Sequence, residues 1–303
     1  MKITAAALII AISVSASATT TVPGDVAVAA GAYCCCITCP PDPAVLLMDN
    51  AGHTKALLPA AGAVAFGPTG HLFAGSRTNV VEYDTSLNVV RTMTPINNAY
   101  RIAIAHNGDV YVLGENALVT VFSSTGAVKK TVTLANSGFF PLAWDLGPDG
   151  CTLYYTDNTL AGRRYDACRD QQLADLEPGP WYALRTTSDG GYVVVNDTAV
   201  KVFDADNHVV RIVAANRSGG PWALSFDIDP GVLWWVAGRT MKFRFAWNTQ
   251  TVITAAYGSS IAVNGEWRPT SAALATASIP AVSPLLLVAL AAALAAIALT
   301  RAA

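Results

Sequence analysis

The chain has 303 residues, of which 52% are hydrophobic and only 13% are charged, and its formal net charge is −2. The few charged residues form no basic patch, which argues against nucleic acid as a partner. Without its two apolar ends the chain keeps about 250 residues, enough to bury the core of one large domain.

The first segment in chain order is a short apolar run behind a basic residue. Lys2 precedes the run Ala5–Val14, and the run leads to Ala16-Ser17-Ala18. A basic start, a short apolar core and an Ala-x-Ala site are typical of a secretory signal peptide. We therefore expect residues 1–18 to be cleaved off after Ala18, and the mature protein to lie outside the cell or on its surface.

Turn glycines then recur at nearly even spacing along the chain. The intervals between them are 38, 42, 40 and 41 residues, and the glycines are Gly70, Gly108, Gly150, Gly190 and Gly231. Each lies between two apolar runs, where a tight hairpin turn needs the positive φ that glycine adopts easily. A period near 40 in an all-β sequence predicts a β-propeller with one blade per repeat.

A sixth blade is split between the two ends of the repeat region. Gly24–Val28, Val45–Gly52 and Thr54–Leu58 resemble the second, third and fourth strands of a blade, and Ser260–Gly265 can supply the first. Such closure pairs the chain ends and removes exposed sheet edges. We expect six blades over residues 19–268, with five or seven as the alternatives, and a linker at 269–284.

The blade texture is carried best by three segments. Pro141–Asp145 and Pro221–Ala223 match the start of a Pro-x-x-[Ala/Ile]-x-Asp-x-x-Gly pattern, and Arg164–Asp166 matches the strand that follows it. This texture resembles the NHL-repeat and gluconolactonase-like group of propellers. The resemblance implies an interaction module or, as the alternative, a secreted hydrolase or lyase with its site at the central channel. A propeller scaffold supports many functions, so the fold does not choose between them.

Six cysteines in an exported chain indicate disulfides. Cys151 opens the second strand of its blade and Cys168 follows the third, so antiparallel pairing brings them together and predicts a bond between them. The other four form a cluster for which two disulfides are favoured over a metal site, with their pairing open; they are Cys34, Cys35, Cys36 and Cys39.

Propellers usually bind ligands where loops enter the innermost strands. Six polar or aromatic residues fall in those loops or strands here: Asn98, Tyr100, Asp145, Trp181, Trp222 and Asp227. They predict an aromatic-lined channel mouth for a protein, peptide or carbohydrate ligand, and a divalent cation such as calcium is the one cofactor left open. The alternative is that the tryptophans are core residues between blades and that the aspartates bond to backbone or turn groups.

No motif assigns a catalytic residue. A Gly-x-Ser-x-Gly elbow, a Walker loop and a His-x-x-x-His pair are all missing from the sequence. The four histidines fall at or near predicted turns, where solvated side chains are the simpler interpretation. The preferred function is therefore a binding module without enzymatic activity.

The chain ends in the apolar run Leu285–Leu299. Fifteen helical residues span about 22 Å, less than the roughly 30 Å of a bilayer core. Ile279–Ser283 with the terminal Arg301 resembles the IPTL-type sorting tail of bacteria, whereas Ser271-Ala272-Ala273 with its spacer matches a GPI-anchor signal. A plain membrane anchor at residues 285–300 is the third alternative. All three tether the propeller to a membrane or cell surface through its C-terminus.

Overall fold

The computed structural model describes residues 19–30, 44–59, 62–135, 143–157, 159–196, 198–214, 223–227, 232–236, 240–244, 249–254, 260–266, 268 and 270–276. The predicted signal peptide, the four-cysteine cluster and the C-terminal tail lie outside these residues. Within the described part of the chain, no helix has the length and apolarity needed to span a bilayer.

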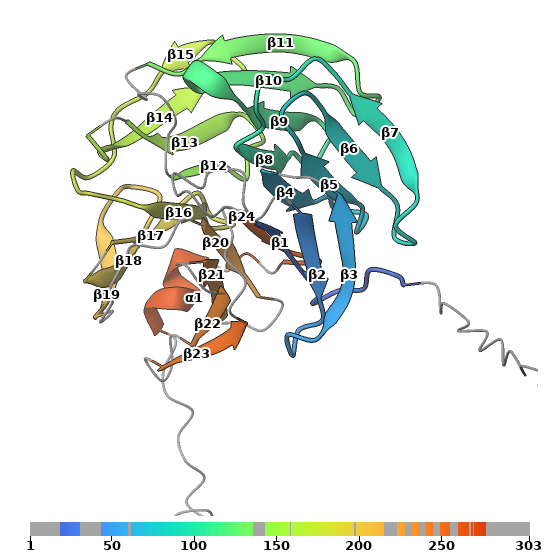
Figure 1. The fold of residues 1–303 in the computed structure, drawn as a ribbon. Coiled ribbons are helices and arrows are strands. Elements are labelled where there is room, and N and C mark those ends of the chain that lie inside the picture. The colour runs from blue at the N-terminus through green and yellow to red at the C-terminus, as the bar shows by residue number, and fades with distance from the viewer. Residues whose placement is uncertain are drawn as a thin grey trace, which may run out of the picture.

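The described strands form six four-stranded antiparallel sheets arranged around a common centre (Figure 1). Three sheets, each listed from the centre outwards, are β24 (Ser260–Val263), β1 (Val26–Ala30), β2 (Ala44–Met48) and β3 (Thr54–Pro59); β4 (Ala63–Phe66), β5 (Leu72–Gly75), β6 (Val80–Tyr83) and β7 (Val89–Met93); and β8 (Arg101–Ile104), β9 (Val110–Leu113), β10 (Leu118–Phe122) and β11 (Val128–Thr133).

The other three sheets continue the ring in chain order. They are β12 (Trp144–Leu146), β13 (Thr152–Thr156), β14 (Gly162–Asp166) and β15 (Gln171–Gln172); β16 (Ala183–Thr186), β17 (Tyr192–Val195), β18 (Ala199–Phe203) and β19 (Val209–Ala214); and β20 (Ala223–Phe226), β21 (Val232–Val236), β22 (Thr240–Arg244) and β23 (Thr249–Thr254). A 3₁₀ turn, η1 (Glu115–Ala117), and a short helix, α1 (Ser271–Thr276), complete the described elements.

The ring closes by pairing strands from the two ends of the repeat region. β24 lies antiparallel to β1, with Val263 opposite Val26 and Ser260 opposite Ala29. Each innermost strand also contacts the next around the ring, in the order β24, β4, β8, β12, β16, β20 and back to β24. The all-β propeller predicted from the glycine spacing is therefore confirmed, including the sheet assembled from both ends.

The hairpin between the first and second strands explains the glycine spacing. Gly70, Gly108, Gly150 and Gly190 have φ values of 78°, 83°, 67° and 85°. In each turn the glycine N–H donates to the carbonyl three residues earlier, as Gly108 does to Ala105 at 2.9 Å. These conformations favour glycine because a Cβ would be strained there. Gly231 lies outside the described residues.

A cross-link anchors the start of the second strand in several sheets. Just before β1, Asp25 pairs with Lys55 of β3 at 2.6 Å, and just before β9, Asp109 pairs with Lys129 of β11 at 2.6 Å. The same position in the next sheet, just before β13, holds Cys151, which a disulfide joins to Cys168 in the turn after β14. The residue just before the second strand is therefore held by an ion pair in two sheets and by a disulfide in a third.

Candidate functional site

The centre of the propeller contains a cavity of about 410 Å³. Every innermost strand contributes one large apolar side chain at an equivalent position, and together these form a ring of Val64, Ile102, Trp144, Leu184, Leu224 and Ile261. Small-molecule sites in proteins commonly measure about 300–1,000 Å³ and are mostly apolar. The cavity therefore has the size of a site for a small ligand, and its lining combines this apolar ring with charged side chains.

The next residue along each innermost strand is small in four of the strands but charged in two neighbouring ones. It is alanine in β4, β8 and β24 and serine in β20, but it is Asp145 in β12 and Arg185 in β16. Arg185 donates from Nη1 to Asp145 Oδ1 at 2.8 Å. It also holds Glu266, donating from Nε to Oε1 at 2.7 Å and from Nη2 to Oε2. One arginine therefore joins two carboxylates inside the channel.

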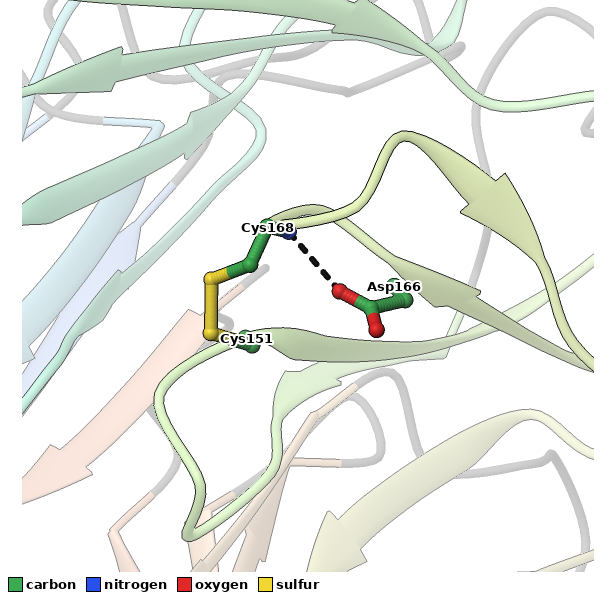
Figure 2. Close-up of side chains that lie close together, drawn as sticks. All are labelled: Cys151, Asp166 and Cys168. Carbon is green, nitrogen blue, oxygen red and sulfur yellow. Dashed lines mark hydrogen bonds between the residues drawn. A yellow bond between two sulfur atoms is a disulfide. The ribbon is translucent and has the colours of Figure 1, made fainter.

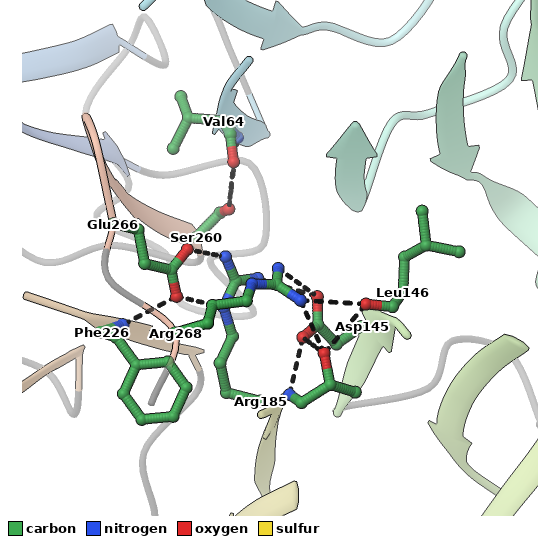
Figure 3. Close-up of polar contacts among 9 residues, drawn as sticks. Val64, Asp145, Leu146, Arg185, Phe226, Ser260, Glu266 and Arg268 are labelled. Atoms are coloured by element: carbon green, nitrogen blue, oxygen red, sulfur yellow. Dashed lines mark hydrogen bonds and ion pairs between the residues drawn. The ribbon is translucent and has the colours of Figure 1, made fainter. Parts of the chain in front are cut away.

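The chain beyond β24 closes the end of the channel where the innermost strands finish. There Glu266 accepts from the Phe226 N–H at 2.9 Å. Arg268 donates from Nη1 to Thr186 Oγ1 at 2.6 Å, and its Nη2 pairs with Asp145 Oδ1 at 3.4 Å. Figure 3 shows Arg185 and Arg268 converging on Asp145. We call Asp145, Arg185, Glu266 and Arg268 the channel network.

Helix α1 fixes this closing segment to the neighbouring sheet. Asp189, in the turn between β16 and β17, accepts from the Ser271 N–H at 2.9 Å and from the Ser271 hydroxyl at 2.8 Å. Arg211 of β19 donates to the Leu274 carbonyl at 2.7 Å. The chain just after the channel network is therefore held against the sheet of β16 to β19.

Burial and neighbouring charges shift the pKa values of the channel network in opposite directions. Asp145 has no exposed surface, and this burial raises the pKa of its carboxyl group. The charges of Arg185 and Arg268 and the hydrogen bonds from Thr186 outweigh burial and hold the pKa of Asp145 below its ordinary value of 3.8. Burial lowers the pKa of Arg185, but Asp145 and Glu266 raise it above its ordinary value. Both groups are therefore charged at neutral pH.

The residues predicted at the channel mouth do not line the cavity. Asn98 donates to Glu115 Oε1, and Tyr100 is buried beside it in the chain. Asp227, directly after β20, accepts from Asn50 Nδ2 at 3.0 Å and from Trp234 Nε1 at 2.8 Å. These contacts join sheets to loops and to one another.

The two tryptophans predicted at the channel mouth are Trp181, which the structure describes, and Trp222, which it does not. Trp181 is almost completely buried, donates from Nε1 to the Glu177 carbonyl at 3.1 Å and packs edge-on against Phe203. This placement matches the alternative in which a tryptophan is a core residue. Trp222 lies outside the described residues. Among the described members of the predicted set, Asp145 contacts the lining residues Arg185 and Arg268 through its side chain, and Tyr100 contacts the lining residue Arg101 through its carbonyl.

Three members of the channel network were missed from the sequence. Arg185 carries a usable signal, because it is the one cation at its position when the innermost strands are aligned. Glu266 and Arg268 carry none, since they lie after the last strand of the repeat and have no counterpart in other blades.

The two cysteines beside β13 and β14 form a structural disulfide (Figure 2). Cys151 and Cys168 form a disulfide with their Cα atoms 5.3 Å apart, between the start of β13 and the end of β14 as the sequence predicts. Asp166 lies within 4.8 Å of both sulfurs and accepts from the Cys168 N–H at 2.9 Å. These three residue types can bind metals, but the disulfide occupies both sulfurs, and a metal binds the free thiolate.

Comparison with known proteins supports the fold and leaves the family open. No protein-family model and no curated protein matches the chain. Among solved structures, the chain is similar to a protein of unknown function from Bacteroides caccae, with a TM-score of 0.60 and 12% sequence identity over 81% of this chain and 100% of that chain. At this identity the likeness shows a shared fold alone. Membership of the NHL-repeat or gluconolactonase-like group stays a prediction.

Proposed function

We propose that this chain is an exported, surface-tethered binding module whose ligand site is the cavity at the centre of the propeller. The observation that carries the proposal is the cavity itself, about 410 Å³ in volume and ringed by apolar side chains from all six innermost strands. Export and tethering are supported by the signal-like segment at residues 1–18 and the apolar tail at 285–300.

The charges beside the cavity favour binding over metal-dependent chemistry. A divalent cation needs several carboxylate or carbonyl oxygens with free lone pairs. Here Asp145 accepts from Arg185, Arg268 and Thr186, and Glu266 accepts from Arg185 and Phe226. The two carboxylates thus neutralise arginines, and this disfavours the gluconolactonase-like alternative.

A cavity-filling variant tests the proposal. Ala65 of β4 lines the cavity, so Ala65→Leu occupies space that a ligand would use. Ala127→Leu is the matched control, since Ala127 is exposed in the turn before β11. We expect small apolar fragments detected by ligand-observed NMR on the full chain to lose binding in Ala65→Leu and to keep it in Ala127→Leu.

A second variant guards against a folding artefact. Ala262→Leu fills the same cavity from β24, and circular dichroism identifies which variants are folded. Fragments that bind the folded cavity-filled variants as well as the wild type would place the site elsewhere, and a complete lack of fragment binding would reject the cavity as a site. Export is tested separately by mass spectrometry, which should find a mature N-terminus at Thr19.

A further inference from the structure

We infer that the cavity selects ligands with an apolar body and an anionic group, the anion being bound by Arg185 and Arg268. This inference rests on the proposed function and specifies the ligand class for that same site. It follows from how hydrogen-bond donors and acceptors are distributed in the channel network.

The carboxylates of the channel network already accept most of the hydrogen bonds they can make: Asp145 accepts four and Glu266 accepts three. Asp145 Oδ2 accepts from the Thr186 N–H and hydroxyl, both at 2.8 Å, while Oδ1 pairs with both arginines. Glu266 Oε1 accepts from Arg185 Nε and the Phe226 N–H, and Oε2 accepts from Arg185 Nη2. A ligand that enters the cavity therefore meets few free acceptors in this network.

The arginines, in contrast, retain free donors. Each guanidinium has five N–H groups, and each makes three hydrogen bonds within the described residues. Two N–H groups on Arg185 and two on Arg268 thus have no acceptor in the described part of the chain. Both side chains line the cavity. A guanidinium with two N–H groups available can bind a carboxylate or phosphate through two hydrogen bonds.

Two nearly isosteric probes test the inference by isothermal titration calorimetry on the full chain. Phenylacetate and phenylacetamide share an aromatic body, but the first alone carries a negative charge. We expect phenylacetate to bind about tenfold more tightly or better, because a charged hydrogen bond is stronger than a neutral one. Arg268→Gln should bring the two affinities together, whereas Arg164→Gln, on β14 outside the cavity, should leave the preference unchanged.

The outcomes separate this inference from the proposed function. Equal affinities for both probes, abolished by Ala65→Leu, would overturn the anion preference and leave the cavity as a binding site. A phenylacetate preference that persists in folded Arg268→Gln would also overturn it, because the anion would then lie elsewhere. Absence of binding by these probes and by every fragment in the NMR screen would overturn the proposed function as well.

Discussion

Replacing Arg185 by methionine should destabilise the propeller strongly. Arg185 is largely buried, with 17% of its side chain exposed, and it contacts a carboxylate, Asp145, that has no exposed surface. Methionine keeps much of the side-chain volume and removes the positive charge. The change therefore leaves a buried anion with one of its two cationic partners gone.

The structure sets the expected size of the effect. Removing one partner of a buried ion pair costs about 3–5 kcal/mol of unfolding free energy. Asp145 would keep Arg268 at 3.4 Å and two hydrogen bonds from Thr186, so the loss should lie near the lower end, about 3 kcal/mol. Asp145→Asn in the Arg185→Met background removes the stranded charge, so the double variant should lose less than the sum of the single variants, by about 1–3 kcal/mol.

Urea denaturation followed by tryptophan fluorescence measures these differences on the full chain. Arg164→Met is the matched control, because Arg164 lies on β14 and makes an exposed bond to the Ala174 carbonyl. Its unfolding free energy should change by no more than about 0.5 kcal/mol. A loss below about 1 kcal/mol in Arg185→Met, or strict additivity with Asp145→Asn, would refute the reasoning that this ion pair is a buried structural element.

Three further predictions concern covalent, electrostatic and steric features. Replacing Cys151 and Cys168 together by serine should lower the unfolding free energy by about 3 kcal/mol, because the disulfide closes a loop with a sequence separation of 17 residues; denaturation at matched pH measures it, and an unchanged midpoint would argue against the bond. The pKa of Asp145 is lowered on folding, so its stabilisation is complete above its unfolded value of 3.8 and is lost as pH falls toward the folded value; acid titration should therefore show a steeper loss of stability for wild type than for Asp145→Asn. Gly75→Ala should cost about 1–3 kcal/mol, since the new Cβ would lie 2.5 Å from the Ala99 Cβ, and thermal melting would contradict this by showing no shift.

The architecture could be predicted from the sequence because its causes are local and repeated. A hairpin turn with positive φ recurs in the repeats and places a glycine at the same point of each: Gly70, Gly108, Gly150 and Gly190. The pairing of β24 with β1 was also accessible, since an incomplete blade at one end needs a strand from the other.

The contents of the channel could be predicted only in part. Asp145 was correctly noticed in an innermost strand, and its bond to the Thr186 N–H fits the alternative of a structural aspartate. Its partners come from a different blade and from the segment after the last strand, so no local pattern connects Asp145 to Arg185 or Arg268. The loop residue Asn98 likewise donates a hydrogen bond to Glu115. The repeat pattern contains no signal for this contact, so the sequence could not predict it.

A crystal structure of the full chain grown with phenylacetate tests the central claim most directly. The account predicts the aromatic ring among the six apolar side chains of the cavity and the carboxylate within hydrogen-bond distance of Arg185 and Arg268. A channel without the ligand, in crystals where phenylacetate is bound elsewhere on the protein, would contradict it.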